Sequence, residues 1–205
     1  MNDAYNETLF NFLYSDVNGY SLSHEARGAH DDKEIIKELL YGEVPFAVWR
    51  EIVEKTNPKK DGVFFDLGSG TGRVVMESHI VFDFKKSIGV ELLKGLHDKA
   101  CEVKDKFDKF VKPKILNQLK DRELQFVNAN IFEVDLQEAD LIFMNHPFKD
   151  RELFEKLEEK FLKELKPQTK IVTTIRSLNN RAFKDLGSKK YKFSWGESTI
   201  YFHEV

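Results

Sequence analysis

The stretch VFFDLGSGTG, residues 63–72, decides the fold of this chain. Its first five residues are mostly apolar and predict a short buried strand, and its three glycines predict a tight turn into a helix over residues 73–82. Ligands of open α/β sheets bind beside the carboxyl ends of the strands, so this turn is the first candidate binding site. Its spacing is G-x-G-x-G, one residue shorter than the G-x-G-x-x-G of dinucleotide-binding folds.

Two acidic residues belong to the same predicted site. Asp66 directly precedes the turn, and a carboxylate there favours a cationic group on the ligand. Glu91 ends the next predicted strand, 87–91, where an acid can accept hydrogen bonds from both hydroxyls of a ribose. A glycine turn that served only close packing of a helix on a strand would leave these two acids unexplained. The combination therefore predicts a nucleotide-like ligand.

Strands and helices alternate along the rest of the chain. Further strands are predicted over 124–128, 140–144 and 170–176, and further helices over 93–110 and 152–165. This alternation predicts an α/β fold with a doubly wound, mostly parallel sheet and helices on both faces. Two close strands near the C-terminal end, 191–195 and 198–203, predict an antiparallel edge.

The N-terminal part is expected to be helical. Helices are predicted over 6–14, over 33–41 with Gly42 as the C-cap, and from Pro45 to about residue 55. Residues 17–20 are interpreted as a turn.

Composition narrows the class of protein. Hydrophobic residues make up 41% and charged residues 33%, which is typical of a soluble globular protein. The net charge of −3 argues against stable nucleic-acid binding. One cysteine, the lack of a signal-like N-terminus and the lack of a long apolar run favour a cytoplasmic protein without membrane association. No Cys/His cluster has metal-ligand spacing, so no metal is expected.

Residues 63–75 together with Glu91 resemble motif I and the following acidic position of the class I S-adenosylmethionine-dependent methyltransferases. The resemblance implies a Rossmann-like fold with a seven-stranded sheet, an antiparallel C-terminal strand at the edge, and S-adenosyl-L-methionine as the cofactor. Because this cofactor has no pyrophosphate, the shorter glycine spacing has a physical reason. The cofactor contacts that it implies here are Phe65, Asp66, Gly68, Ser69, Gly70, Thr71, Gly72, Arg73 and Glu91.

The segment Asn145-His146-Pro147-Phe148 follows the fourth predicted strand and is expected to face the transferred methyl group. It resembles two family elements. One is the N-P-P-Y element of methyltransferases that act on the amino group of adenine or glutamine amide, although His146 stands where the first proline belongs. The other is an Asn before an aromatic-rich stretch in the Dot1-type protein-lysine methyltransferases. Both resemblances make Asn145 and Phe148 the candidates for the catalytic site.

Three further segments resemble the Dot1 type. Tyr41-Gly42-Glu43 is similar to a Y-G-E element whose loop closes over the cofactor. Asn130 and Ile131 match a polar–apolar pair that contacts adenine, with Asn where the family usually has Asp. Residues 193–203 are similar to the closing hairpin of the family. The implied organisation is a helical extension with the cofactor-covering loop, residues 1–55, before a methyltransferase core, residues 56–205, in one compact domain.

The leading hypothesis is a Dot1-like protein-lysine N-methyltransferase whose partner is a protein substrate that presents a lysine. The alternatives are an enzyme that methylates adenine, glutamine amide or a small molecule, and a fold that serves only as a binding module. Methyl transfer is an in-line displacement, in which orientation contributes about 7–11 kcal/mol. A lysine has to arrive neutral, which a dry aromatic channel favours. Candidate walls of that channel are Tyr41, Phe148, Trp195 and Tyr201.

Overall fold

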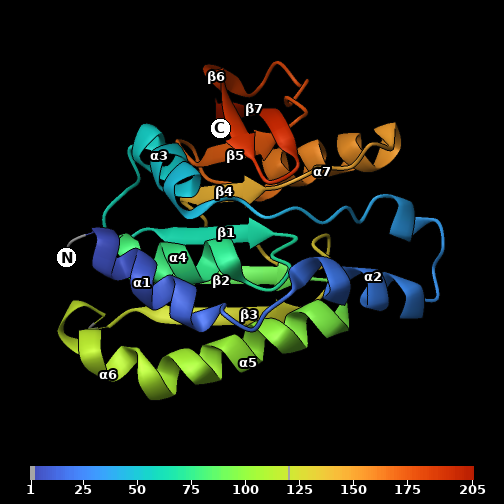
Figure 1. The fold of residues 1–205 in the computed structure, drawn as a ribbon. Helices are drawn as coiled ribbons and strands as arrows, with labels where there is room; N and C mark the ends of the chain where they lie inside the picture. The colour runs from blue at the N-terminus through green and yellow to red at the C-terminus, as the bar shows by residue number, and fades with distance from the viewer. Residues whose placement is uncertain (1–2, 120) are drawn as a thin grey trace.

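Seven strands pair into one sheet in the computed structural model, which describes residues 3–119 and 121–205 (Figure 1). They are β1 (Val63–Leu67), β2 (Lys86–Glu91), β3 (Glu123–Asn128), β4 (Leu141–Met144), β5 (Lys170–Thr174), β6 (Lys184–Phe193) and β7 (Gly196–Glu204). Their order in the sheet is β3-β2-β1-β4-β5-β7-β6. The first five strands pair in parallel, and β7 runs antiparallel to both β5 and β6. The expected Rossmann-like sheet is therefore confirmed, with the antiparallel pair at one side and β6 outermost.

Helices cover both faces of this sheet (Figure 1). They are α1 (Asp3–Leu13), α2 (Gly19–Ala29), α3 (Phe46–Thr56), α4 (Arg73–Val81), α5 (Lys94–Phe110), α6 (Lys112–Ile115) and α7 (Arg151–Glu164), with 3₁₀ turns η1 (Ile35–Lys37) and η2 (Leu116–Gln118). Side chains of α1, α3, α4 and α5 share one apolar cluster with the sheet, and those of α7 share the cluster on the other face. Both faces of β1 and β4 are thus buried, as the unbroken apolar pattern of a central parallel strand requires.

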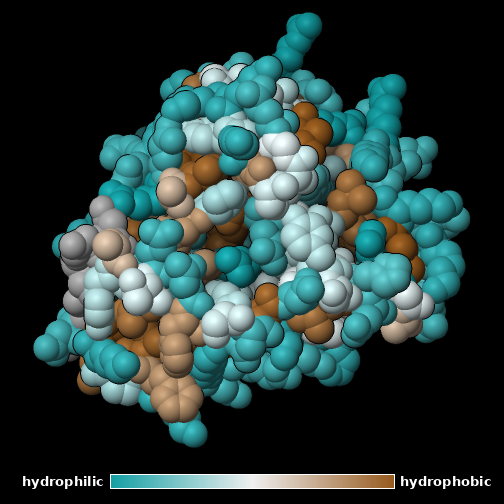
Figure 2. Space-filling view, in the orientation of Figure 1, coloured by the Kyte–Doolittle hydropathy of each residue, from teal (hydrophilic) through white to brown (hydrophobic). Residues whose placement is uncertain are grey.

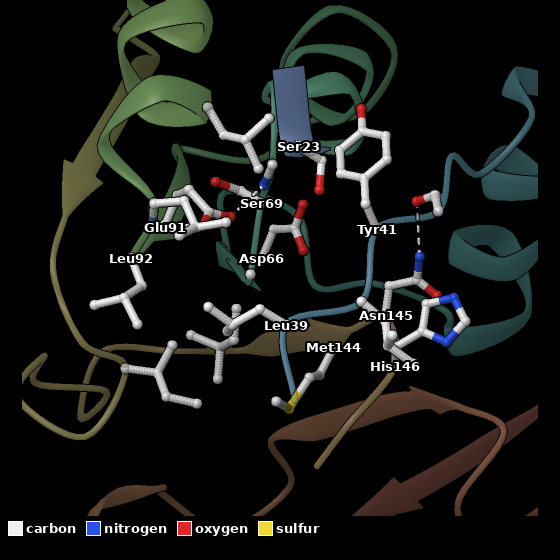
Figure 3. A pocket seen from close by; sticks show the side chains of 18 of the residues that line it. Ser23, Leu39, Tyr41, Asp66, Ser69, Glu91, Leu92, Met144, Asn145 and His146 are labelled. Carbon is white, nitrogen blue, oxygen red and sulfur yellow. Dashed lines mark hydrogen bonds between the residues drawn. The ribbon is translucent and has the colours of Figure 1, made fainter. Parts of the chain in front are cut away.

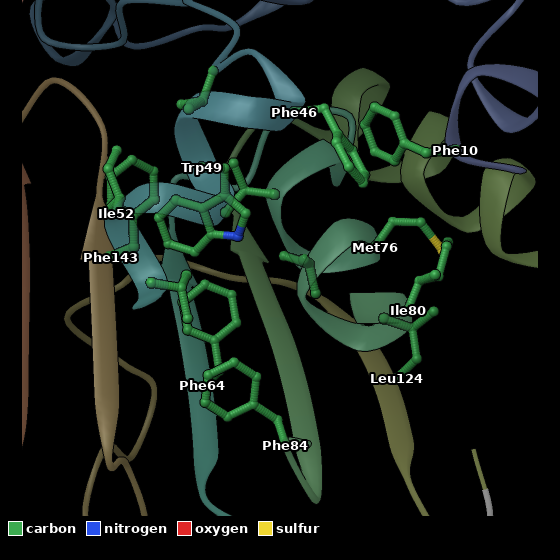
Figure 4. Close-up of a cluster of buried hydrophobic side chains, with 14 of the residues drawn as sticks. Phe10, Phe46, Trp49, Ile52, Phe64, Met76, Ile80, Phe84, Leu124 and Phe143 are labelled. Atoms are coloured by element: carbon green, nitrogen blue, oxygen red, sulfur yellow. The ribbon is translucent and has the colours of Figure 1, made fainter. Parts of the chain in front are cut away.

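Trp49 anchors α3 in the core (Figure 4). Its ring centroid lies 5.5 Å from that of Phe64 on β1 and 4.6 Å from that of Phe143 on β4. Its indole N–H donates to Oγ of Ser78 on α4 over 2.9 Å. The chain between η1 and α3 lines the same cavity as residues at the carboxyl ends of β1 and β4, where the candidate site lies.

The predicted helix over 33–41 is wrong. Only the single turn η1 forms there, begun by the Asp32 carboxylate, which accepts hydrogen bonds from the backbone N–H groups of Glu34 and Ile35. Residues 39–45 are neither helix nor strand. The Tyr41 hydroxyl and the Gly42 carbonyl bond to Thr71 and Asn145, far along the chain, and Pro45 disfavours a helical conformation in the residue before it.

Helix α2 was not predicted, and the turn expected over 17–20 is wrong. Asn18 is instead the N-cap of α2, and its side-chain oxygen accepts a hydrogen bond of 3.1 Å from the N–H of Ser21. The helix escapes a periodicity argument because its buried positions are Gly19 and Ser23, not large apolar residues.

Strand β6 begins seven residues earlier than the sequence indicated, at Lys184 instead of residue 191. Residues 184–190 are all exposed and carry no alternation of apolar and polar side chains. The pairing with β7 alone identifies this part as a strand.

Most of the surface in Figure 2 is hydrophilic, and the hydrophobic residues on this face stand in small separate groups. No described helix is long and apolar enough to cross a lipid bilayer.

Candidate functional site

The glycine turn bends over the carboxyl end of β1. Gly68, Gly70 and Gly72 have φ angles of 87°, 55° and 79°, the left-handed region that strains any residue with a Cβ. The backbone N–H groups of Gly68 and Ser69 donate to the carbonyl of Val90 on β2 over 2.9 and 3.0 Å. These hydrogen bonds hold the turn against the neighbouring strand. The left-handed conformations explain why glycine recurs at every second residue of the turn.

Glu91 closes the other side of this turn. Its carboxylate accepts a hydrogen bond of 2.8 Å from the N–H of Gly70 and another of 2.8 Å from the N–H of Leu93. Burial raises the pKa of Glu91 above its usual value, and these N–H groups oppose that rise. Each carboxylate oxygen has one lone pair left. Glu91 lines the cavity described below, so it can accept two further hydrogen bonds from a ligand.

Asp66, at the end of β1, is 2% exposed. Its Oδ1 atom has no hydrogen-bond partner within the described part of the chain. Burial, followed by the charge of Glu91, raises the pKa of Asp66 well above its usual value. A buried carboxylate is stable only when it is protonated or meets a cation or donor. Asp66 therefore marks the place where a cationic ligand group would be stabilised.

Tyr41 and Glu43 lie against the glycine turn. The Tyr41 hydroxyl donates to Oε1 of Glu43 over 2.9 Å and lies 3.2 Å from Oγ1 of Thr71. Its ring fills the space where a Cβ on Gly70 would stand, at 2.8 Å. The other carboxylate oxygen of Glu43 lies 3.7 Å from Nε of Arg73, the first residue of α4. The segment Tyr41-Gly42-Glu43, named the strap from here on, thus covers the turn.

Asn145 holds the middle of the strap. Its side-chain N–H donates to the carbonyl of Gly42 over 2.9 Å, and its Oδ1 accepts from the hydroxyl of Thr174 over 2.9 Å. The Thr174 hydroxyl also accepts from the N–H of His146 over 2.8 Å. A Cβ on Gly42 would stand 2.6 Å from the ring of Trp195, so only glycine fits beneath that ring.

Aromatic rings gather at this end of the site. Phe148 stacks on Phe132 with 5.6 Å between ring centroids and 11° between planes. The ring of His146 lies 5.0 Å from that of Trp195, and burial lowers the pKa of His146 below its usual value. Phe132, His146 and Phe148 line the cavity. Trp195 does not line it but packs against Gly42, and Tyr201 does not line it either.

These groups enclose one cavity with about 1050 Å³ of empty space, part of it open to solvent (Figure 3). The predicted residues that line it are Tyr41, Gly42, Glu43, Asp66, Gly68, Ser69, Gly70, Thr71, Arg73, Glu91, Asn130, Ile131, Asn145 and Phe148.

Two predicted residues do not line the cavity. Phe65 is buried in the core cluster shared with α7, on the opposite face of the sheet from Trp49. Gly72 lies under the turn, where a Cβ would stand 2.5 Å from the ring of Phe126. Phe65 lies two residues before the end of β1, and Leu67, which belongs to the same cluster and ends the strand, lines the cavity instead.

Asn130 follows β3 and begins the turn that carries Ile131 and Phe132. Its Oδ1 accepts a hydrogen bond of 3.1 Å from the N–H of Phe132, which leaves its side-chain N–H₂ and one lone pair available. Ile131 is buried at the cavity wall. Asn130 and Ile131, the polar–apolar pair expected to contact adenine, therefore lie just after the carboxyl end of β3.

Sequence reasoning missed several lining residues. Leu92, Leu93 and Met144 lie at strand ends, so the general rule for ligand sites in α/β sheets would have found them. Ser23 of α2 also lines the cavity, and no pattern in the sequence pointed to it. Within the described residues, no group of three His, Cys, Asp or Glu side chains is placed to hold a metal ion.

The cavity has the chemistry that S-adenosyl-L-methionine requires. Glu91 offers acceptors for ribose hydroxyls, Asp66 offers an unpaired carboxylate for a cation, and Ile131 offers an apolar wall. The seven-stranded, mostly parallel sheet, the glycine turn after β1 and the acid that ends β2 match the fold and motif I of the class I S-adenosylmethionine-dependent methyltransferases.

The model of the family described as "Histone methylation protein DOT1" matches residues 30–193, more than half of the chain. The chain belongs to this family.

Two curated relatives support the assignment. A histone-lysine N-methyltransferase, H3 lysine-79 specific, of Caenorhabditis elegans is 31% identical over 157 residues, which cover 76% of this chain and 16% of that protein. A protein-lysine N-methyltransferase of Saccharolobus islandicus is 30% identical over 141 residues, 67% of this chain and 77% of that protein. The chain therefore spans a small part of the first relative and most of the second.

A solved RNA methyltransferase from Salinibacter ruber, in complex with S-adenosyl-L-homocysteine, matches with a TM-score of 0.55 and 19% identity. The match covers 80% of this chain and 93% of that one, and it shows the shared fold alone.

Proposed function

We propose that this protein transfers a methyl group from S-adenosyl-L-methionine to the side-chain amine of a lysine in a protein substrate. The observation that carries the choice of acceptor is the bonding of Asn145. Its amide donates to Gly42 and accepts from Thr174, so the strap and Thr174 fix its orientation, and only one N–H and one oxygen lone pair remain for an acceptor. Methyltransferases of the adenine or glutamine-amide type need that amide for their acceptor.

The aromatic end of the cavity fits a lysine. The stacked rings of Phe132 and Phe148 form an apolar wall beside Asn145, and His146 adds a ring whose pKa is lowered by burial. Such surroundings disfavour an ammonium and favour the neutral amine, the only form that is nucleophilic. Aromatic faces also attract a methylated ammonium product, by about 0.5–2 kcal/mol each. The two curated relatives, both named as lysine methyltransferases, agree with this choice.

Different residues around the cavity would bind different parts of the cofactor. Glu91 would hold the ribose, Asn130 and Ile131 the adenine, and Asp66 the cationic amino-acid end of the cofactor. When bound, S-adenosyl-L-methionine supplies a methyl group on a cationic sulfur, which an amine can displace. The strap and Asn145 would keep water out and fix the direction of approach, which is the main contribution an enzyme makes to such a displacement.

The decisive experiment is an acceptor assay. The purified protein is incubated with S-adenosyl-L-methionine labelled in its methyl group and, in parallel, with a cell lysate, core histones, DNA or RNA, and the products are hydrolysed and identified. We expect the label in methyl-lysine. Label in methyl-adenine or methyl-glutamine would overturn the choice of acceptor. Glu91→Ala is the matched inactive control, because it removes both carboxylate hydrogen bonds around the glycine turn.

A further inference from the structure

Helix α2 lies outside the family match of residues 30–193, yet it forms part of the cavity wall. Three contacts fix it there. Gly19 leaves room for the Tyr41 hydroxyl, which a Cβ would meet at 1.8 Å. The ring of Tyr20 packs edge-on against that of Tyr41, with 5.3 Å between centroids. Toward the C-terminal end of α2, the Cβ of Ala26 lies 3.3 Å from the position that a Cβ on Gly95 of α5 would take.

Ser23 is the polar side chain that this helix directs inward. It is 1% exposed, and its hydroxyl has no hydrogen-bond partner within the residues that the structure describes. Asp66 is in the same condition: it is 2% exposed, and its Oδ1 is unpaired. In Figure 3 the two side chains point toward the same part of the cavity. An unpaired buried hydroxyl destabilises a fold, and alanine would fill this position at lower cost.

We propose that Ser23 is a cofactor-positioning residue whose hydroxyl, together with the Asp66 carboxylate, binds the amino-acid group of S-adenosyl-L-methionine. This inference rests on the proposed function. The ligand's ammonium has three N–H donors, so it can satisfy the carboxylate and the hydroxyl oxygen together. Glu91 and Asn130, on β2 and after β3, are left for the adenosine part. The N-terminal helices thus supply a ligand contact that the family match does not contain.

The test compares two ligands that carry the amino-acid group with one that lacks it. Dissociation constants are measured by titration calorimetry for S-adenosyl-L-methionine, S-adenosyl-L-homocysteine and 5′-methylthioadenosine, which lacks that group. We expect Ser23→Ala to weaken the first two about tenfold or more, as loss of a hydrogen bond to a charged group does, and to leave the third unchanged. Ser23→Cys, which keeps the size but bonds weakly, should behave like Ser23→Ala. Ser21→Ala, on the exposed side of the same helix, is the matched control.

Thermal unfolding without ligand gives a second readout. Removal of an unpaired buried hydroxyl should leave the Tm of the cofactor-free protein unchanged or raised. A lowered Tm with equal loss of affinity for all three ligands would mean that Ser23 only supports the fold, and it would overturn the inference. Unchanged affinity of Ser23→Ala for both cofactor forms would overturn it as well, with the proposed function intact. If the wild-type protein binds none of the ligands, the proposed function and the inference fail together.

Discussion

The side-chain amide of Asn145 donates a hydrogen bond of 2.9 Å to the carbonyl oxygen of Gly42, which precedes it by 103 residues. This bond joins the end of β4 to the strap, and Thr174 on β5 supports it through the other atom of the same amide. The position of the strap over the glycine turn therefore depends on two strand ends that lie side by side in the sheet.

We expect Asn145→Ala and Thr174→Val each to weaken cofactor binding and slow methyl transfer. Because the two side chains act on the strap through one chain of hydrogen bonds, their effects should not add, and a double-mutant cycle on the cofactor Kd should give a coupling of about 0.5–3 kcal/mol. Thr169→Val, which removes a buried hydroxyl bonded to the Ala139 carbonyl at the start of β5, is the control. Strictly additive losses would show that Asn145 does not act through the strap.

Gly42→Ala should weaken cofactor binding about tenfold or more, because the added Cβ would stand 2.6 Å from the ring of Trp195 and would push the strap aside. Trp195→Leu in the same chain should restore much of the affinity by making room. Gly28→Ala is the control, since nothing lies within 4 Å of its Cβ position, and alanine is the better helix former. If Trp195→Leu gives no rescue, crowding against the Trp195 ring is not the cause, and the clash with Nε2 of His146, 2.9 Å from the same Cβ, takes its place.

Asp66→Asn should stabilise the cofactor-free protein at pH 8 and weaken its binding of S-adenosyl-L-methionine. The pKa of Asp66 is raised in the folded state, by burial first and by Glu91 second. The folded protein therefore binds more protons than the unfolded chain above the ordinary pKa of Asp, and its free energy of unfolding falls as the pH rises from there through the folded-state pKa. Denaturant unfolding from pH 4 to 8 should show this fall in the wild type and a flatter profile in Asp66→Asn, with a gain of about 1–3 kcal/mol at pH 8. A less stable variant at pH 8 would contradict the argument.

Glu91→Gln should change the stability in the opposite direction, although burial raises the pKa of Glu91 too. The Glu91 carboxylate accepts the N–H groups of Gly70 and Leu93, one on each oxygen, whereas glutamine would turn its own N–H₂ toward one of them. We expect a loss of about 1–3 kcal/mol in the free energy of unfolding without cofactor, together with weaker binding. Denaturant unfolding and calorimetry of the two variants side by side would test the contrast. If Asp66→Asn and Glu91→Gln changed the free energy of unfolding in the same direction, the hydrogen bonds between Glu91 and the turn would not contribute to stability.

Phe148→Leu should lower the turnover number with a protein substrate and leave the cofactor Kd within about twofold, because leucine keeps most of the volume but removes the flat face stacked on Phe132. Steady-state kinetics with saturating cofactor, together with calorimetry, separates the two effects. A change in Kd as large as that in turnover would place Phe148 at the cofactor end instead.

The part of the site that could be predicted from the sequence is the part with local causes. Gly68, Gly70 and Gly72 adopt left-handed backbone conformations, and Asp66 and Glu91 end adjacent strands, so a pattern of neighbours along the chain was enough. Each of these lies at the same edge of a sheet whose parallel order follows from alternating strands and helices.

The part that could not be predicted has causes far away in the chain. Residues 39–45 are not helical because Tyr41 and Gly42 bond to Thr71 and Asn145. Ser23 lines the cavity because α2 docks on α5 and the strap through glycine, alanine and tyrosine, without an apolar stripe that a periodicity argument could detect. Phe65 belongs to the motif, but its side chain packs in the apolar cluster shared with α7 and does not line the cavity.

The outermost position of β6 has a consequence for solubility. An edge strand offers unpaired backbone groups to any other extended chain, and exposed lysines and bulges are common defences against such pairing. The sequence of β6 begins KDLGSKK, its pairing with β7 is irregular between Asp185 and Ser188, and Lys189 forms an ion pair with Glu51 of α3. The charged residues at the start of β6 prevented its prediction from an apolar–polar pattern. The same residues disfavour pairing of this edge with a second molecule, the first step of aggregation.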